Sequence, residues 1–268
     1  MPIPIVGNRP MKSLPGQRFP VLTISWLLLG CFLISGSSLG IYLQIASVPA
    51  SARLALDSLN GLDIHAVHEK GLDPTKVTSD VATYRGRRAL RLLNDDSAIS
   101  KGNPTGGQSL AIVTGSDFAD GAIEIELVGL PRKGAPPDTR GFVGLAFHVQ
   151  NNGDRFEAFY LRFTNGRAED QLRRNHSAQY VSEPDFPWFR LREENPGLYE
   201  SYVDIEPEAW TSVRIVVAGN KARLYVNYAA QPCLLVNDLK LGAARGRVAV
   251  WSGSDTEAYF SNLRIDPR

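Results

Sequence analysis

The chain has 268 residues, of which 43% are hydrophobic and 21% are charged, and its formal net charge at pH 7 is +1. This composition supports a buried core, and it excludes a disordered chain, a collagen-like repeat and a scaffold built on disulfides. The near-neutral charge also argues against nucleic acid as a partner, because a protein that binds nucleic acid usually carries a basic excess.

The first 60 residues have the pattern of a membrane-targeting segment. Residues 1–18 form a basic tail without acidic residues, and 19–48 are uncharged and largely apolar. A positive flank before a long apolar stretch predicts a transmembrane signal anchor; the alternative is a signal peptide cleaved near Ala52. The length of the stretch favours the anchor, with 49–60 as a linker. We therefore expect 61–268 to be an extracytoplasmic domain, periplasmic or extracellular, tethered to the cell membrane or secreted after cleavage.

From about residue 88 to the C terminus, apolar and polar residues alternate, and turn-forming Gly, Asn and Asp residues separate the alternating stretches. This pattern is typical of half-buried strands joined by tight turns. The predicted strands are Ala89–Leu93, Ser109–Thr114, Gly121–Leu127, Gly141–Val149, Glu157–Phe163, Tyr199–Ile205, Thr211–Ala218, Ala222–Tyr228, Gly246–Ser252 and Ala258–Ile265. Many short strands with almost no helical period predict an all-β fold, a two-sheet antiparallel sandwich.

Because alternate side chains of a strand point to opposite faces, the pattern also predicts which residues point outward. In 121–127 the apolar residues define the inner face, which leaves Glu124 and Glu126 outside. If the strands are neighbours, one face carries polar groups able to bind sugar hydroxyls: Glu124, Glu126, His148, Tyr160, Arg162, Tyr202 and Asp204. The alternative is an ordinary solvated sheet face, which is polar in every sandwich.

Four strings resemble a known superfamily: Trp210 to Val217, Ala222 to Asn227, Gly246 to Trp251 and Ala258 to Leu263. They are similar to concanavalin A-like (laminin G-like) jelly rolls, and within these to bacterial 3-keto-disaccharide hydrolase-like and glycoside hydrolase family sixteen-like domains. The resemblance covers roughly 85–268. It implies two curved antiparallel sheets with a saccharide bound on the concave one, and it implies the fold more strongly than any activity.

The segment from 164 to 198 is too long for a hairpin connection, and we expect it to be a functional loop over the polar face. Arginine forks bind carboxylates or vicinal hydroxyls, and tryptophan stacks on sugar rings. The candidate ligand-binding residues are Tyr160, Arg162, Arg167, Asp170, Arg173, Arg174, His176, Trp188 and Tyr202. The alternatives are a solvated loop with internal ion pairs and a Trp188 that only anchors the loop. Trp210 and Trp251 lie in predicted strands and are interpreted as core.

Three functions fit these features. The first is carbohydrate binding. The second is hydrolysis of a glycoside, with Glu124, Glu126 and His148 as catalytic candidates. Family sixteen enzymes show an E-x-D-x-x-E pattern, from which Glu124-Ile125-Glu126 departs at the middle and last acids. The third is a laminin G-like module that binds another protein. No motif indicates a metal or another cofactor; calcium in the loop 151–154 is left open, and Cys233 is predicted to be a buried, unreactive thiol.

Overall fold

The computed structural model describes residues 66–68, 77–94, 107–150 and 153–268. The predicted basic tail 1–18, the apolar segment 19–48 and the linker 49–60 all lie outside these residues. Among the residues that are described, no helix combines the length and the apolar character needed to cross a bilayer.

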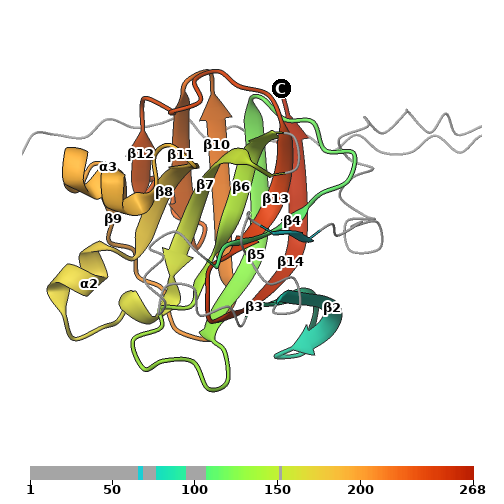
Figure 1. The fold of residues 1–268 in the computed structure, drawn as a ribbon, viewed down its shortest axis with the longest axis vertical. Coiled ribbons are helices and arrows are strands. Elements are labelled where there is room, and N and C mark those ends of the chain that lie inside the picture. The colour runs from blue at the N-terminus through green and yellow to red at the C-terminus, as the bar shows by residue number, and fades with distance from the viewer. Residues whose placement is uncertain (1–65, 69–76, 95–106, 151–152) are drawn as a thin grey trace, which may run out of the picture. The chain divides into compact units, whose positions relative to one another are not determined.

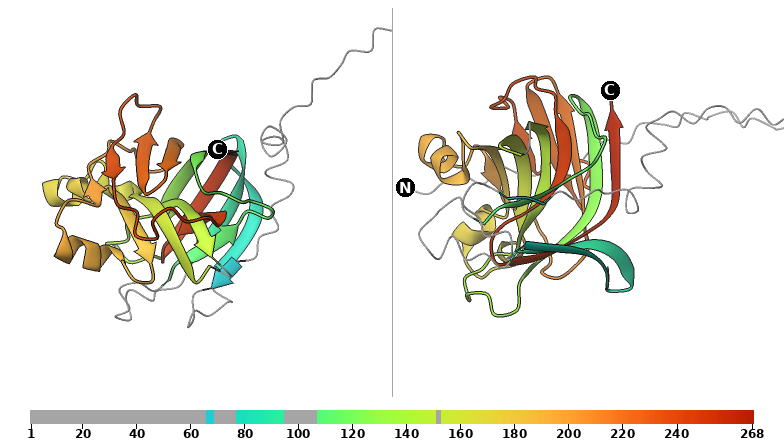
Figure 2. Two further views of the ribbon diagram at one scale, coloured as in Figure 1. Left: turned by 90° about the horizontal axis from the view of Figure 1, so that it is seen from above. Right: turned by 45° about the vertical axis from the view of Figure 1, so that its right-hand side comes forward.

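The described chain folds into two antiparallel sheets of seven strands each, which form the two layers visible in Figure 1 and Figure 2. The first sheet has the order β1 (Ala66–His68), β4 (Ser109–Ile112), β13 (Arg247–Ser252), β6 (Phe142–Gln150), β7 (Arg155–Arg162), β8 (Ala178–Glu183) and β9 (Glu200–Ser201). The second has the order β12 (Leu234–Val236), β11 (Lys221–Val226), β10 (Thr211–Ala218), β5 (Gly121–Pro131), β14 (Thr256–Pro267), β3 (Arg87–Asn94) and β2 (Val77–Tyr84). The predicted all-β, two-sheet antiparallel sandwich is confirmed.

The core lies between the two sheets and follows the predicted alternation. Ile123 and Ile125 of β5 are buried there against residues of the opposite sheet such as Leu145 of β6 and Phe159 of β7. A second apolar cluster covers the outer face of the first sheet and includes Tyr160 and other residues one position out of phase with the core. The first sheet is therefore apolar on both faces.

The prediction that 164–198 is a long loop is wrong, because the segment contains regular secondary structure. The segment contains η3 (Phe163–Asn165), α2 (Gln171–Asn175), the buried strand β8 and α3 (Trp188–Glu194). In β8 the outward positions carry the polar side chains of Gln179 and Glu183, which masked the strand pattern in the sequence. The predicted strand Tyr199–Ile205 is reduced to the two residues of β9.

A β-bulge in β6 changes the predicted parity after Phe147. The register with β7 shifts between Phe147 and Gln150, and His148 adopts a positive φ of 51°. As a result His148 is fully buried instead of facing outward, and Val149 packs in the outer cluster instead of the core. A bulge adds one residue to a strand and so reverses the alternation beyond it.

Candidate functional site

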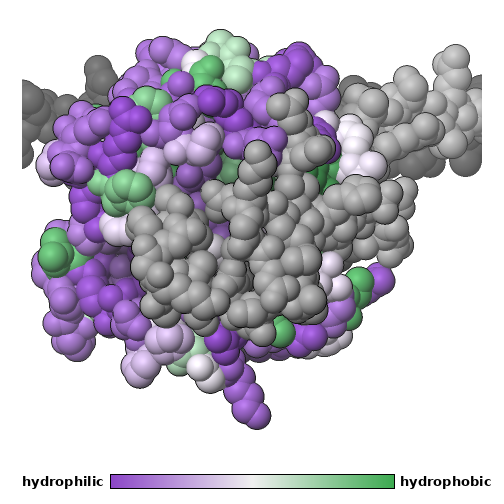
Figure 3. Space-filling view, viewed as in Figure 1, coloured by the Kyte–Doolittle hydropathy of each residue, from purple (hydrophilic) through white to green (hydrophobic). Residues whose placement is uncertain are grey.

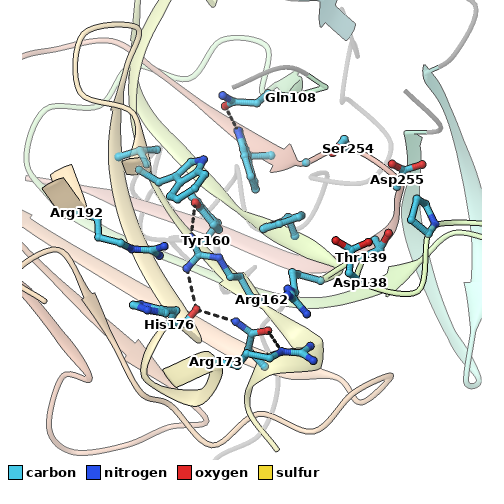
Figure 4. A pocket seen from close by; sticks show the side chains of 18 of the residues that line it. Gln108, Asp138, Thr139, Tyr160, Arg162, Arg173, His176, Arg192, Ser254 and Asp255 are labelled. Carbon is cyan, nitrogen blue, oxygen red and sulfur yellow. Dashed lines mark hydrogen bonds between the residues drawn. The ribbon is translucent and has the colours of Figure 1, made fainter. Parts of the chain in front are cut away.

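A pocket of about 420 Å³ opens on the outer face of the first sheet. Four apolar or aromatic side chains from successive strands line it: Phe142 of β6, Tyr160 of β7, Val181 of β8 and Trp251 of β13. Polar side chains from the loop 136–140, from α2 and α3 and from the turn 253–255 complete the lining (Figure 4). The predicted covering segment thus reaches the pocket through two short helices.

Two aromatic rings stack inside the pocket lining. Tyr160 and Trp251 have ring centroids 4.6 Å apart and an interplanar angle of 21°. Between their strands lies β6, whose Gly144 pairs in register with both residues. A Cβ atom at Gly144 would lie 2.6 Å from the Cα atom of Tyr160, so the close approach depends on the absence of a side chain.

Trp251 is buried, in agreement with its interpretation as core, but it belongs to the outer cluster and not to the core between the sheets. Val248 and Val250 of the same strand pack in the core, so alternation directs Trp251 to the outer face, where it lines the pocket. Its Nε1–H donates to Gln108 Oε1 at 2.8 Å, and Gln108 Nε2–H donates to Glu183 Oε1 at 3.1 Å. The alternation of Val248, Val250 and Trp251 was the signal that could have placed this residue.

Arg162 is held rigidly beside Tyr160. Its Nη1–H donates to the carbonyl oxygen of His176 at 2.8 Å, and its Nη2–H donates to Tyr160 Oη and to Gln179 Oε1, both at 3.1 Å. Burial lowers the pKa of the Arg162 guanidinium and raises the pKa of Tyr160 to about 12. All three acceptors are neutral, and no carboxylate among the described residues makes a salt bridge or hydrogen bond with Arg162.

The helix α2 presents Arg173 to the pocket. Asp170 caps the helix, because its Oδ1 accepts from the backbone N–H of Arg173 at 3.1 Å. The guanidinium of Arg173 donates to Thr164 Oγ1 at 3.2 Å and to Asn165 Oδ1 at 3.4 Å. Asp170 therefore supports the site from outside, while Arg173 is one of the residues that line it.

A second polar group joins α2 to α3. The Nε and Nη2 atoms of Arg192 donate to the carboxylate of Glu200, with distances of 3.1 Å to Oε1 and 2.7 Å to Oε2. His176 Nδ1 lies 2.7 Å from Glu200 Oε2. The guanidinium of Arg192 lies 4.8 Å from the centroid of the Trp188 ring. Burial lowers the pKa of His176, although Glu200 opposes this shift.

Of the nine predicted ligand-binding residues, the structure places five in the pocket lining: Tyr160, Arg162, Arg173, His176 and Trp188. The other four do not line it. Asp170 is the helix cap, Arg167 pairs with Asp204 at 3.1 Å, and Arg174 Nη2–H donates to Tyr202 Oη at 2.8 Å. Both contacts are exposed, but neither is the internal ion pair of the alternative interpretation, because Asp204 and Tyr202 lie outside the segment 164–198.

The predicted catalytic acids do not join this pocket. Glu124 and Glu126 belong to β5 of the second sheet, and the core separates them from the outer face of the first sheet. Glu124 Oε1 lies 3.1 Å from Arg214 Nε, its neighbour on β10, and Glu126 Oε2 lies 2.6 Å from Arg87 Nη1 on β3. The expectation that they share one face with Tyr160 and Arg162 is wrong, because alternation assigns a side chain to a face but not a strand to a sheet.

His148 does not reach the pocket either. Its Nδ1 lies 2.7 Å from Glu157 Oε2, and its Nε2 lies 2.9 Å from the carbonyl oxygen of Ala119. The other carboxylate oxygen of Glu157 accepts from Tyr180 Oη–H at 2.6 Å and from the backbone N–H of Leu241 at 3.2 Å. His148 and Glu157 are fully buried, so the group is a polar network inside the sandwich.

Trp210, also interpreted from the sequence as core, is not fully buried. It is half-buried in a small cluster on the outer face of the second sheet, where Arg87 lies 4.7 Å from its ring centroid and Tyr84 packs edge-on. Trp210 is therefore a partly exposed tryptophan on the sheet that does not carry the pocket. Cys233 is half-buried and not fully buried as predicted, and burial raises the pKa of its thiol to about 11. Among the side chains that are described, no three His, Cys, Asp or Glu residues gather as a metal site would require.

Sequence reasoning missed several lining residues besides Trp251: Gln108, Asp138, Arg140, Glu183, Arg192 and Asp255. Most of them lie in turns or short helices, where no period relates a residue to a face. Figure 3 shows that the surface over α2 and α3 is mostly hydrophilic. These two helices contribute Arg173 and Arg192 to the pocket lining.

The two-sheet sandwich agrees with the concanavalin A-like lectin and glucanase class that the sequence resembles. No protein-family model matches the sequence, and no curated protein matches it. The structure is similar to the carbohydrate-binding module CBM66 from Bacillus subtilis, with 12% identity over 70% of this chain and 93% of that chain and a TM-score of 0.46. It is also similar to a Bacillus subtilis protein of unknown function with a galectin-like fold, with 10% identity over 70% and 86% of the chains and a TM-score of 0.45. Similarities this low leave the ligand to be argued from the pocket itself.

Proposed function

We propose that the chain is a carbohydrate-binding protein whose ligand occupies the pocket on the outer face of the first sheet. The observation that carries this proposal is the composition of the lining, in which aromatic side chains lie beside fixed polar groups. Sugars need both, because a ring presents apolar C–H faces and a rim of hydroxyls. The volume of about 420 Å³ is within the range of small-molecule sites.

The polar groups of the lining are already oriented by the protein. Arg162, Gln108 and Arg192 each hold a fixed position through hydrogen bonds to neighbouring side chains. Groups held in this way lose little conformational freedom when a ligand binds, which favours affinity. Trp188 is half-buried at the pocket wall and packs against the outer apolar cluster, so its ring surface is positioned in the same manner.

The positions of the predicted catalytic residues favour binding over hydrolysis. A retaining glycosidase needs two carboxyl groups about 5–5.5 Å apart on either side of the scissile bond. Glu124, Glu126 and His148 all lie outside the pocket, and each is engaged with a partner elsewhere. A protein-interaction module would be expected to present a flat apolar surface, whereas this site is a pocket with fixed hydrogen-bonding groups.

The test compares two tryptophan variants of the full-length chain on a broad glycan array. We expect Trp188→Ala to weaken binding at least about tenfold, because it removes the apolar platform. Trp210→Ala removes the same side chain from the outer face of the other sheet and is expected to leave binding unchanged. Circular dichroism and the melting temperature of both variants show whether each remains folded.

Absence of binding across neutral and charged glycans would contradict the proposal, and so would an equal loss in the two variants. Release of sugar from any bound glycan would show that the pocket hydrolyses its ligand, and the carboxyl groups of Asp138, Glu183 and Asp255 would then be the ones to replace.

We also propose that the domain acts outside the cytoplasm, held at the membrane by the apolar segment 19–48. The support is the sequence pattern of a basic flank before an uncharged stretch. An alkaline phosphatase fusion after residue 268 is expected to be active in a bacterial host, and a deletion of 19–48 is expected to abolish that activity. An inactive fusion would contradict the proposed location.

A further inference from the structure

The pocket lining is unusually rich in arginine. Four guanidinium groups line it, those of Arg140, Arg162, Arg173 and Arg192. Arg192 is neutralised by Glu200, whose carboxylate accepts from two of its nitrogens. Within residues 77–94, 107–150 and 153–268, the other three make no salt bridge to a carboxylate. Three arginines without a salt bridge in one pocket repel one another, so their presence there calls for an explanation.

Arg162 and Arg173 do not need an anion to hold their positions. Their five hydrogen-bond acceptors are a backbone carbonyl, a phenol, two side-chain amides and a hydroxyl, all of them neutral. For Arg173 the bonds involve Nε and Nη2, and Nη1 makes none within the described part of the chain. An arginine placed in this way keeps part of its donor fork for a ligand.

Arg140 is the least committed of the three. Its side chain is half-buried at the pocket and makes no hydrogen bond to any described residue. Burial lowers the pKa of Arg140 most, and the positive charges of Arg173 and Arg162 lower it further. The lowered pKa therefore reflects burial first and the neighbouring positive charges second.

The acidic residues of the lining do not neutralise this cluster. Asp255 Oδ1 lies 2.7 Å from Arg132 Nη2, and Glu183 accepts from Gln108. Figure 4 shows Arg162 and Arg173 on the side of the pocket away from Gln108, with Asp255 at a third side. Asp138 and Asp170 both raise the pKa of Arg140, but both are exposed to solvent and neither makes a salt bridge to it within the described residues.

We propose that the pocket selects an acidic saccharide, whose carboxylate or sulfate group is bound by Arg140 and Arg173 above the fixed charge of Arg162. This inference rests on the saccharide-binding function proposed above. An oxyanion would use the free donors of both arginines and offset the repulsion between the three cations. Arginine forks match the geometry of carboxylate and sulfate oxygens, and such charge-assisted hydrogen bonds are among the strongest in proteins.

The experiment uses the full-length chain on a glycan array that carries neutral, uronate-bearing, sialylated and sulfated oligosaccharides. The best-bound glycan is then titrated beside its carboxyl-reduced or desulfated form, which distinguishes a carboxylate from a sulfate as the recognised group. We expect the uncharged form to bind at least about tenfold more weakly, because it loses charge-assisted hydrogen bonds. Affinity for the acidic form is also expected to fall as the NaCl concentration is raised, whereas affinity for neutral glycans is expected to stay the same.

Three variants locate the recognised group. Arg140→Gln and Arg173→Gln are each expected to weaken the acidic glycan about tenfold and to change affinity for the uncharged form less than about twofold. Asp138→Asn removes a competing carboxylate and is expected to strengthen binding of the acidic glycan. The matched control is Arg245→Gln, which removes one positive charge from an exposed pair with Asp117 away from the pocket.

The outcomes separate this inference from the function on which it rests. Equal or tighter binding of uncharged glycans would overturn the acidic selectivity and leave saccharide binding standing. An equal loss in Arg245→Gln would also overturn it, since the attraction would then be that of net charge. Failure of every glycan to bind would overturn both proposals.

Discussion

Tyr160 and Trp251 stack face to face although a whole strand lies between theirs, with 4.6 Å between the ring centroids. Gly144 of β6 makes this possible, because it occupies the register position between them and has no side chain. The stacked pair forms the aromatic part of the pocket lining, so a glycine in one strand determines the shape of a site built from two others.

Gly144→Ala is therefore expected to lower the free energy of unfolding by about 1–3 kcal/mol, since the new methyl group must displace the backbone of β7. Glycan affinity is expected to fall with it. Thermal melting and glycan titration measure the two effects. Gly86→Ala is the comparison: it has a positive φ and open space around it, so it is expected to cost about 1 kcal/mol and leave affinity unchanged. Equal effects of the two substitutions on affinity would contradict this role of Gly144.

The buried network around Glu157 is expected to stabilise the fold without contributing to binding. Glu157→Gln removes the charge that accepts hydrogen bonds from Tyr180 and Leu241 and pairs with His148, and we expect the free energy of unfolding to fall by at least about 2 kcal/mol. Urea unfolding measures this loss, and glycan titration at a temperature where the variant is folded is expected to give an unchanged affinity. Asp117→Asn, which breaks an exposed pair, serves as the control with a change below about 0.5 kcal/mol. A large loss of affinity in Glu157→Gln would show that the network reaches the ligand.

His176 is expected to make stability depend on pH. Burial first, and then the positive charges of Arg192 and Arg162, lower its pKa in the folded chain, while Glu200 opposes the shift. A group with a lowered folded pKa contributes stability that is present above its unfolded pKa of about 6.5 and is lost as pH falls through the folded pKa. The melting temperature of the native chain should thus fall more steeply below about pH 6.5 than that of His176→Gln. Parallel curves for the two proteins would contradict the assignment.

Arg192 is expected to need its guanidinium shape and not only its charge. Lysine at this position cannot donate two bonds to Glu200 while covering the Trp188 ring, so Arg192→Lys is expected to weaken glycan binding by about threefold to tenfold. Arg190→Lys is the control on the same helix, because Arg190 pairs with Glu194 and does not line the pocket. Calorimetric titration measures both, and an unchanged affinity for Arg192→Lys would show that charge alone suffices.

The sequence predicted the sandwich because alternation is a local property of each strand. Ile123, Ile125, Phe159 and Leu161 all face the core as their parity indicates, and Tyr160 and Arg162 face outward. The same alternation also predicts that Trp251 faces outward, because Val248 and Val250 face the core, and the interpretation of Trp251 as core did not use it.

Alternation says nothing about which strands share a sheet, and for that reason Glu124 and Glu126 were expected beside residues from which the core separates them. It also fails beyond a bulge, as His148 shows, because a single added residue reverses every later side chain. The polar part of the lining was only partly predicted. The chemistry of Arg173 and His176 indicates a binding role, whereas Arg140 and Gln108 lie in segments without any period.

The most direct test of the central claim uses the four tryptophans as probes. With 5-fluorotryptophan incorporated into the full-length chain, each ring gives one fluorine resonance, assigned by single Trp→Phe variants and followed as the best-bound acidic glycan is added. A ligand in the pocket is predicted to shift the resonances of Trp188 and Trp251 and to leave that of Trp210 in place. A shift of the Trp210 resonance with the other two unmoved would contradict the account, because the ligand would then lie on the opposite sheet.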